Sequence, residues 1–262
     1  LLFMAPIAVG KESIAAVIAF QDITLIKEAD QAKNQFLKVI SHELRTPLTS
    51  IIGWAKMLQE APEIMPEAVP IILQSAHQFE GLLERMIILS RILTGKLTTR
   101  QETVNLCTLA TEVETEFQPA AARKGVILTW LPPAESPQTE GDTHLIRMAF
   151  SELVDNAINF TPAGGRVTLT CHTTPDDRVT FTVTDTGRGI TTEELPNIMK
   201  PFSQFRREEA IGGIGIGLTL VQGIAHAHHG EVVATSPGID QGATVTMILP
   251  MALAERHDSK EA

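Results

Sequence analysis

Two helical patterns in the first hundred residues constrain the fold more than any other feature of the sequence. Apolar residues recur at steps of three and four over residues 25–60, and a second such run covers residues 69–93. This spacing places apolar side chains along one stripe of an α-helix. Pro62 and Pro66 mark a turn between the two runs. We therefore predict a helical hairpin.

The second run is a heptad stripe whose apolar face is too wide for one partner helix. The stripe consists of Val69, Ile72, Ala76, Phe79, Leu83, Met86, Ser90 and Leu93. Further apolar residues, among them Leu73 and Ile87, widen the face. A lone hairpin would leave this surface in water, so we predict a dimer through residues 30–95 that forms a four-helix bundle.

Composition limits the partners and the compartment of the chain. The 262 residues can form two domains, and 21 Lys and Arg against 31 Asp and Glu argue against nucleic acid as a partner. The apolar run over residues 5–20 is interrupted by Lys11 and Glu12, so no segment approaches a membrane span. We expect a cytoplasmic fragment without membrane contact or export signal, which leaves room for an anchor upstream. Cys107 and Cys171 are not spaced as zinc ligands or as a redox pair, so we expect ordinary thiols.

Beyond Gly95 the pattern changes to a mixture of strands and helices. The strands expected from β-branched runs are 126–130, 166–171, 179–185, 231–235 and 244–249. The helices expected from apolar periodicity are 106–124, 143–160 and 218–228. The proline-rich stretch 131–137 is expected to be a surface loop. We predict an α/β sandwich after the hairpin.

His42 lies in the first helical pattern but outside its apolar stripe. Each helical residue advances by about 100°, so His42 points roughly 200° from Ile40 and roughly 160° from Leu44, towards water. Thr46 returns to within about 40° of His42 and would place a hydroxyl one turn further on the same face. A solvated surface histidine would show the same pattern, so position alone leaves both interpretations open.

Pro47 favours a chemical role for this part of the helix. Inside a helix, proline removes a backbone donor and collides with the carbonyl four residues earlier, here Glu43, at a cost of about 3 kcal/mol. We therefore expect a bend beside His42. The octapeptide 41–48, SHELRTPL, resembles the H-box of histidine kinases over its whole length.

The resemblance implies that His42 is the phosphorylated nucleophile. Glu43 would orient or deprotonate the imidazole, and Thr46 would support phosphatase activity towards a partner regulator. A carboxylate bonded to one imidazole nitrogen fixes the tautomer and stabilises developing charge. The family further implies ATP and Mg²⁺ as cofactors, a homodimer, and transfer of the phosphoryl group to an aspartate of a response-regulator receiver domain.

A second polar group lies in the α/β part of the chain. Glu152, Asn156 and Asn159 fall on one stripe of a helix, which is usually a solvated face but also suits the wall of a cleft. Asp185 ends the inward-facing row of the strand 179–185. A buried carboxylate without a partner is costly, so Asp185 needs a donor such as a ligand amino group.

Glycines follow both polar groups. Gly187 and Gly189 come directly after Asp185 and would let backbone approach a ligand closely. The glycine-rich run 212–217 leads into the last helix, whose N-terminus could receive phosphate charge. The run has neither the Walker spacing nor the strand that precedes a Rossmann fingerprint.

Four segments, taken in order, resemble the N-box, G1, F-box and G2 motifs of the Bergerat-type ATPase fold. They are residues 152–161, 185–190, 201–205 and 212–218. The resemblance implies that Asn156 holds Mg²⁺, Asp185 binds the adenine amino group, and Glu152 helps to orient the metal or catalytic groups. The other nucleotide-binding residues that it implies are Asn159, Gly187, Gly189, Gly213, Gly215, Gly217, Leu218 and Thr244. Of these, the glycines at 187 and 189 would shape the base pocket, and those at 213, 215 and 217 would hinge a lid.

Two positions depart from the family pattern at the phosphate end. Members often carry Lys where Asn159 stands and Thr where Ile214 stands. The loss of Lys removes a positive charge from the triphosphate, which Lys200, Arg206 or Arg207 could replace.

Two alternative functions remain open at this point. A Bergerat-fold ATPase of the topoisomerase, chaperone or mismatch-repair type would share Asn156 and Asp185, but it would not need an exposed His42 beside a proline on a dimerising helix. A non-catalytic signalling scaffold would keep the fold without turnover. Phosphohistidine formation separates both from a kinase.

The chain divides into four expected parts. Residues 1–24 contain a strand over 14–20 and an Asp-Ile-Thr triplet at 22–24 that resembles the end of a PAS sensor domain. Residues 25–97 would form the dimerisation and phosphotransfer domain. Residues 98–255 would form the catalytic ATP-binding domain, and residues 256–262 a tail.

Overall fold

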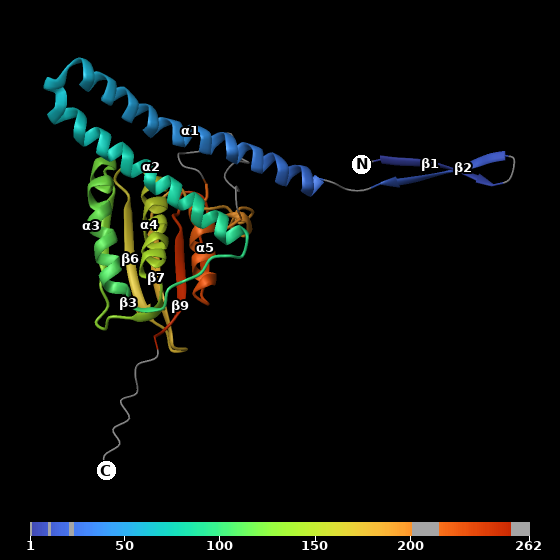
Figure 1. Ribbon diagram of the computed structural model, residues 1–262. Coiled ribbons are helices and arrows are strands. Elements are labelled where there is room, and N and C mark those ends of the chain that lie inside the picture. Colours follow the sequence, from blue (N-terminus) through green and yellow to red (C-terminus); the bar gives the residue numbers. More distant parts are fainter. Residues whose placement is uncertain (1, 10–11, 21–23, 201–214, 253–262) are drawn as a thin grey trace, which may run out of the picture.

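The structure of the chain is a computed structural model that describes residues 2–9, 12–20, 24–200 and 215–252. The first elements are two antiparallel strands, β1 (Leu2–Val9) and β2 (Glu12–Phe20). The strand expected over 14–20 is therefore present, paired in a hairpin (Figure 1). The triplet at 22–24 falls mainly outside the described residues, and the likeness to a PAS domain stays a prediction.

The predicted helical hairpin is confirmed. Helix α1 (Thr24–Glu60) and helix α2 (Met65–Leu93) are joined by a short 3-10 turn, η1 (Pro62–Ile64). The hydroxyl of Ser75 donates to that of Ser50 at 3.0 Å and fixes the level at which the two helices face each other. In Figure 1 α1 and α2 run side by side. Helix α1 continues on both sides of Pro47, and the expected bend there stays a prediction.

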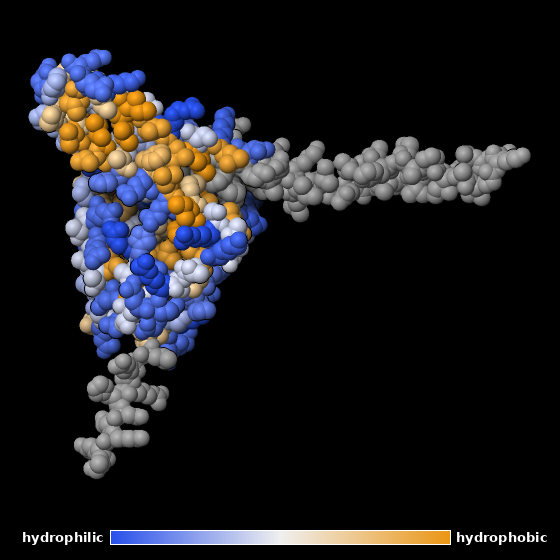
Figure 2. All heavy atoms as spheres, in the orientation of Figure 1, coloured by the Kyte–Doolittle hydropathy of each residue, from blue (hydrophilic) through white to orange (hydrophobic). Residues whose placement is uncertain are grey.

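The heptad stripe of α2 is less buried than its spacing suggests. The buried residues of this helix are Ala68, Ser75, Ile88 and Leu89, none of which belongs to the stripe. Val69, Leu83 and Leu93, which do belong to it, are exposed. The reason is that one partner helix covers only part of the apolar face. In Figure 2 apolar residues gather along the hairpin.

The α/β part is a mixed five-stranded sheet covered by three helices. The sheet order is β4-β6-β7-β9-β8, and β4 and β6 are its parallel pair. The strands are β4 (Ile127–Leu131), β6 (Arg166–Thr173), β7 (Arg178–Asp185), β8 (Glu231–Thr235) and β9 (Thr244–Pro250). The helices are α3 (Leu106–Lys124), α4 (Thr143–Phe160) and α5 (Gly217–Ala227), with a short 3-10 turn η2 (Leu195–Asn197). All the elements expected beyond Gly95 are present within one or two residues.

Two short strands in this part were not expected from the sequence. Strand β3 (Glu102–Asn105) pairs antiparallel with β5 (Gln138–Gly141) in a sheet of their own. Both strands have four residues and are mostly polar, so they lack the alternation of apolar residues that predicts a strand. They close the domain beside the main sheet, where the buried Thr139 donates its hydroxyl proton to the carbonyl of Pro250 at 2.6 Å.

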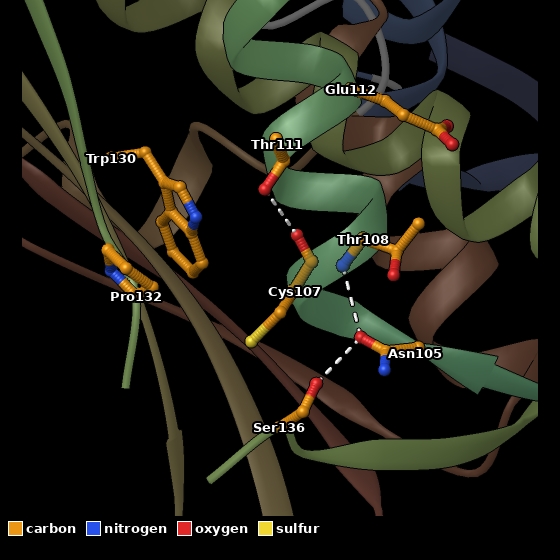
Figure 3. Close-up of a pocket in the computed structure, with 8 residues that line it drawn as sticks. All are labelled: Asn105, Cys107, Thr108, Thr111, Glu112, Trp130, Pro132 and Ser136. Carbon is orange, nitrogen blue, oxygen red and sulfur yellow. Dashed lines mark hydrogen bonds between the residues drawn. The ribbon is translucent and has the colours of Figure 1, made fainter. Parts of the chain in front are cut away.

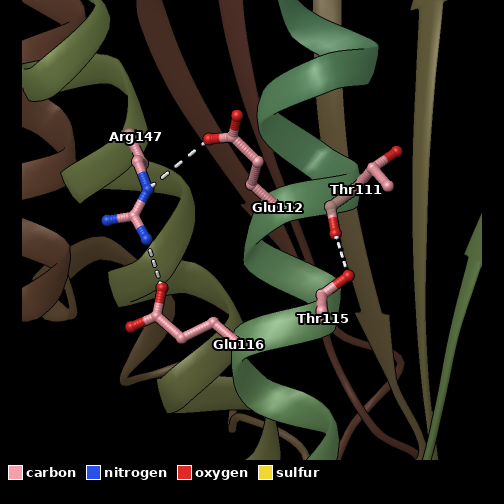
Figure 4. A network of polar contacts seen from close by, with 5 residues as sticks. All are labelled: Thr111, Glu112, Thr115, Glu116 and Arg147. Carbon is pink, nitrogen blue, oxygen red and sulfur yellow. Dashed lines mark hydrogen bonds and ion pairs between the residues drawn. The ribbon is translucent and has the colours of Figure 1, made fainter.

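The core lies between the helices and the sheet. The rings of Phe150 on α4 and Phe181 on β7 stack with centroids 3.6 Å apart, and both are fully buried. The inward row predicted for β7 is confirmed, since Val179, Phe181 and Val183 are all buried. On the outside, Arg147 of α4 forms ion pairs with Glu112 and Glu116 of α3 (Figure 4). These contacts tie the helical layer together.

A buried histidine links the end of α5 to the start of α4. His228 accepts a hydrogen bond from the backbone N–H of Asp142 at Nε2, 2.9 Å away, so Nδ1 carries the proton and donates to the carbonyl of Ile224 at 2.8 Å. Asp142 in turn caps α4 by accepting from the N–H of Leu145. Burial lowers the pKa of His228, which is therefore neutral at physiological pH.

The end of α2 packs against the α/β part. A β-carbon placed on Gly223 of α5 would collide with the side chain of Ile92. A larger residue at 223 would force Ile92 to move, so α2 and α5 are in direct contact. None of the described helices is long and apolar enough to span a bilayer. Both cysteines are free, as expected, and Cys171 is buried.

Candidate active site

His42 is exposed on α1, as the helical geometry predicted. Its side chain is 76% exposed, and Nδ1 lies 3.4 Å from Oε1 of Glu43. Thr46 is also exposed, and its hydroxyl donates to the carbonyl of His42 at 3.2 Å. The three residues therefore form one accessible group, with Nε2 of the imidazole available for chemistry when Nδ1 bonds to the carboxylate.

The polar stripe of α4 runs from the interior to the surface. Glu152 is buried, Asn156 is partly buried, and Asn159 is exposed. The side-chain nitrogen of Asn156 is buried without a hydrogen-bond partner. Nδ2 of Asn159 donates to Asp155 at 3.0 Å, so it is held on the surface by its own helix. A buried N–H group without a partner is costly, so we expect an acceptor from water or a ligand beside Asn156.

Glu152 is the most constrained carboxylate of the site. Oε1 accepts from Nε of Arg85 in α2 at 2.7 Å. Burial, only partly offset by Arg85, raises the pKa of Glu152. On the other side, a β-carbon on Gly217 would lie 2.7 Å from Oε2 of Glu152 and 2.9 Å from Nδ2 of Asn156. Gly217 thus brings the start of α5 against both polar side chains of α4.

Asp185 is the last residue of β7, and one of its carboxylate oxygens accepts hydrogen bonds from the backbone. Oδ1 accepts from the backbone N–H of Gly187 at 2.8 Å and from that of Ala243 at 3.3 Å. Burial raises the pKa of Asp185, and these two backbone hydrogen bonds oppose that effect. Oδ1 accepts both of these hydrogen bonds, so Oδ2 can accept a hydrogen bond from a ligand. Asp185 is therefore oriented for recognition.

The turn after Asp185 has no room for a side chain at either of its two glycines. A β-carbon on Gly187 would collide with the carbonyl of Phe160, and one on Gly189 with the carbonyl of Gly238. Gly189 also has φ of 67°, a conformation that favours glycine. The N–H of Arg188 donates to the carbonyl of Phe160 at 3.2 Å, which joins this turn to the end of α4. The two expected halves of the site thus lie next to each other.

The remaining predicted residues are placed only in part. Gly215 has φ of 71° and precedes α5, and Leu218 lies in its first turn, partly buried. The hydroxyl of Thr244 on β9 lies 3.1 Å from that of Thr184 on β7. Gly213 lies outside the described residues, as do the F-box at 201–205, Arg206, Arg207, Ile214 and the tail at 256–262.

The structure thus gathers two groups of predicted residues and leaves a third apart. Glu152, Asn156 and Gly217 are in contact, and the Asp185 turn joins them through Phe160. His42, Glu43 and Thr46 form the separate group on α1. The chain therefore carries a group of polar side chains and glycines in the α/β part and an exposed histidine on α1.

Sequence reasoning missed Arg85, which reaches Glu152 from α2. A single arginine in an amphipathic helix gives no signal of a distant partner. Reasoning also missed Ser236, whose hydroxyl accepts from the N–H of Ile190 at 2.9 Å and donates to the carbonyl of Gly242 at 2.7 Å, fixing the turn from outside.

In the described part of the chain, no three His, Cys, Asp or Glu side chains come together as possible ligands of one metal ion. Mg²⁺ commonly uses one or two protein oxygens and completes its shell with water and phosphate. The amide of Asn156 and the carboxylate of Glu152 fit that requirement. A shallow hollow of about 490 Å³ near Cys107 and Trp130 holds none of the predicted site residues (Figure 3).

Comparison with protein families identifies both parts of the chain. Residues 32–95 match the His Kinase A phospho-acceptor domain, and residues 141–253 match the ATPase domain of histidine kinases, DNA gyrase B and HSP90. The two matches coincide with the hairpin and with most of the α/β part. The chain belongs to the sensor histidine kinases.

Individual relatives agree with this family. The chain is 29% identical over 232 residues to the adaptive-response sensory kinase SasA of Synechocystis sp., covering 84% of this chain and 60% of that protein. It is 30% identical over 226 residues to the histidine protein kinase DivJ of Caulobacter vibrioides, covering 84% and 38%. The chain thus spans about 60% or less of the length of these curated relatives.

Among solved structures, full-length ShkA in complex with AMPPNP is similar with a TM-score of 0.63 and 26% identity, covering 84% of this chain and 46% of that chain. The likeness includes the order of a helical hairpin followed by an α/β domain. The predicted fold class is therefore confirmed for the single chain.

Proposed function

We propose that this chain is an ATP-dependent protein-histidine kinase that phosphorylates His42 and passes the phosphoryl group to an aspartate of a receiver domain. The observation that carries the proposal is an exposed His42, hydrogen-bonded to Glu43, in a chain that also holds an unsatisfied Asn156 beside a buried Glu152. A nucleophile and a phosphate-type site are the two parts that such a transfer requires. The division into residues 25–97 and 98–255 follows from these roles.

In the nucleotide site, Asp185 would accept the adenine amino proton at Oδ2, while Gly187 and Gly189 leave space for the base. The amide oxygen of Asn156 would hold Mg²⁺, which would neutralise negative charge on the phosphoryl group during its transfer. Gly217, with Gly213, Gly215 and Leu218, would border the phosphates. Asn159 and Thr244 lie at the edges of the same site.

At the hairpin, the Nδ1–H group of His42 would donate a hydrogen bond to Glu43, so Nε2 keeps its lone pair and can attack the γ-phosphorus. The carboxylate then stabilises the positive charge that develops on the ring. The His42–γ-phosphorus bond forms as the bond to the β–γ bridging oxygen breaks. ADP leaves with that electron pair.

A matched pair of histidine variants tests this proposal. With γ-labelled ATP, His42→Gln should abolish labelling of the protein, whereas His77→Gln, which alters another exposed histidine of the hairpin, should leave labelling unchanged. Retained label in the His42 variant would refute the assignment. Circular dichroism checks that both variants fold.

The exposed apolar face of the hairpin supports a homodimer. Leu73 and Ile87 are each 53% exposed, and they lie on a helix whose stripe residues Leu83 and Leu93 are also exposed. A second hairpin would cover this face in a four-helix bundle. Light scattering on the whole chain should give the mass of a dimer at micromolar concentration, and a monomer would contradict the bundle.

Phosphatase activity towards the phosphorylated receiver domain would use Thr46. Its hydroxyl stands one turn from His42 and can position a water for in-line attack on an acyl phosphate. Thr46→Ala should slow hydrolysis of the phospho-receiver and leave autophosphorylation largely intact, with the exposed Thr49→Ala as control. Equal loss of both activities would contradict this role.

A further inference from the structure

Helix α2 holds the α/β part through charged contacts as well as apolar ones. Arg85 pairs with Glu152 at 2.7 Å, and the preceding residue, Glu84, pairs with His144 at 2.7 Å. Further along the same helix, Ile92 fills the space above Gly223. The ion pair of Arg85 differs from the other contacts because its partner belongs to the candidate nucleotide site.

Glu152 has a stronger need for a cation than an ordinary surface carboxylate. Its side chain is 8% exposed, whereas that of Arg85 is 36% exposed. A charged, buried carboxylate that loses its counter-ion is strongly destabilising, so the departure of Arg85 is favoured when another cation takes its place. The guanidinium, by contrast, can return to water at little cost.

The surroundings of Glu152 indicate which cation would replace Arg85. Gly217 adjoins both this carboxylate and the side-chain amide of Asn156, whose oxygen is the atom that can bind a metal ion. A Mg²⁺ ion held by Asn156 would stand within reach of Glu152, directly or through a coordinated water. Two cations cannot share this carboxylate without mutual repulsion.

The position of Arg85 along the hairpin connects it to the phosphorylated residue. The Ser50–Ser75 contact sets the register of the antiparallel helices. In that register Arg85 lies within about one helical turn of the level of His42. Release of Arg85 therefore removes one of the contacts that hold the α/β part beside the section of the hairpin that carries His42.

We propose that Arg85 is a positioning residue that holds the α/β part on α2 through Glu152, and that binding of Mg²⁺ with nucleotide displaces it. The inference rests on the nucleotide site proposed above. Because linkage is reciprocal, docking of α2 weakens binding of the Mg²⁺–nucleotide complex by the same factor by which the complex weakens docking. The chain would thus keep its catalytic part docked until the metal and nucleotide arrive together.

Calorimetric titration of the whole chain with AMPPNP tests the inference without relying on turnover. In excess Mg²⁺, Arg85→Gln should bind the analogue about tenfold more tightly than the unsubstituted chain, within the usual range of coupling between sites. With EDTA in place of Mg²⁺, the two affinities should agree within about twofold. The exposed Arg91→Gln, on the same helix, should match the unsubstituted chain in both conditions.

A double variant tests whether the gain in affinity for AMPPNP comes from loss of the Arg85–Glu152 ion pair. In a Glu152→Gln background, Arg85→Gln should produce no further gain, because the carboxylate for which arginine and metal compete is gone. If Arg85→Gln does not fold, Arg85→Lys should fold and show a smaller gain, since a shorter ammonium holds the carboxylate less well.

Hydrogen exchange supplies an independent readout. Addition of Mg²⁺ and AMPPNP should increase exchange over residues 85–93 of the unsubstituted chain, and Arg85→Gln should show the faster exchange before any addition. Equal or weaker Mg²⁺-dependent affinity in Arg85→Gln, or no change in exchange, would overturn this inference alone. An unsubstituted chain that binds no nucleotide would overturn the proposed function as well.

Discussion

The α/β part and the hairpin differ in how fully each buries its own apolar surface. In the first, Phe150, Phe181 and Leu169 are closed off from water by helices and sheet of the same chain. In the second, large side chains such as Leu73 and Ile87 remain half exposed. One region buries its apolar surface within its own chain, whereas the other leaves an apolar face exposed, which the proposed second copy would cover.

The same difference separates the two halves of the chemistry. The residues proposed to bind nucleotide stand on α4, β7 and the start of α5, all anchored in the buried core. His42 stands on a helix that has a free face and no core of its own. Binding should therefore be a stable property of the single chain, while phosphorylation should depend on how the hairpin is placed.

The largest effect is expected from a change on the hairpin. Glu43→Ala should slow autophosphorylation of His42 by about 10²- to 10⁴-fold, the usual contribution of a positioned acid or base. Affinity for nucleotide, measured by titration, should not change. Glu60→Ala, at the end of the same helix, is the control. Unchanged labelling in the Glu43 variant would remove the carboxylate from the mechanism.

Core and surface substitutions should separate the stabilities of the two regions. Phe150→Ala should lower the free energy of unfolding of the α/β part by about 3–5 kcal/mol, because a fully buried ring is lost. Leu73→Ala should instead weaken the dimer with little effect on that transition. Denaturant unfolding at two protein concentrations measures both. A concentration-independent loss for Leu73→Ala would contradict the contrast.

Asp185→Asn should weaken nucleotide binding by about 1–3 kcal/mol, since a partly buried acceptor is replaced by an amide that must reorient. The fold should survive, because the N–H groups of Gly187 and Ala243 can still bond to the amide oxygen. Titration calorimetry gives the affinity. A folded variant that binds ATP as tightly as before would show that Asp185 does not contact the base.

The sequence predicted the two regions to different depths. Strand and helix bounds of the α/β part follow from periodicity because alternate residues such as Val179 and Phe181 are buried on one side. The burial of α2 could not be predicted, because Ile88 and Leu89 face the α/β part and lie off the heptad stripe. The role of Arg85 could not be predicted for the same reason, because it depends on a tertiary contact with Glu152.

The smallest expected effect is a pH dependence confined to the α/β part. The pKa of His228 is lowered in the folded chain, so on acidification the unfolded chain takes up a proton near pH 6.5 before the folded chain does. The contribution of His228 to the free energy of unfolding is therefore fully present above that pH. It is lost as the pH falls towards the lower pKa that His228 has in the folded chain. The hydrogen bond from Asp142 that protonation breaks is worth about 0.5–1.5 kcal/mol.

Thermal unfolding between pH 7.5 and pH 5 measures this effect. Replacement of His228 by Gln should flatten the pH profile of the α/β transition, whereas His226→Gln, which alters an exposed neighbour, should keep it. A profile that does not respond to the His228 substitution would assign the acid sensitivity to other groups.

The central claim is that nucleotide bound in the α/β part phosphorylates His42 on the hairpin. Its most direct test is to incubate the chain with Mg²⁺ and γ-labelled ATP, digest it, and locate the label. The account predicts acid-labile, base-stable label in the peptide that contains residues 41–48. Release of free phosphate with an unlabelled protein, or acid-stable label elsewhere in the chain, would contradict it.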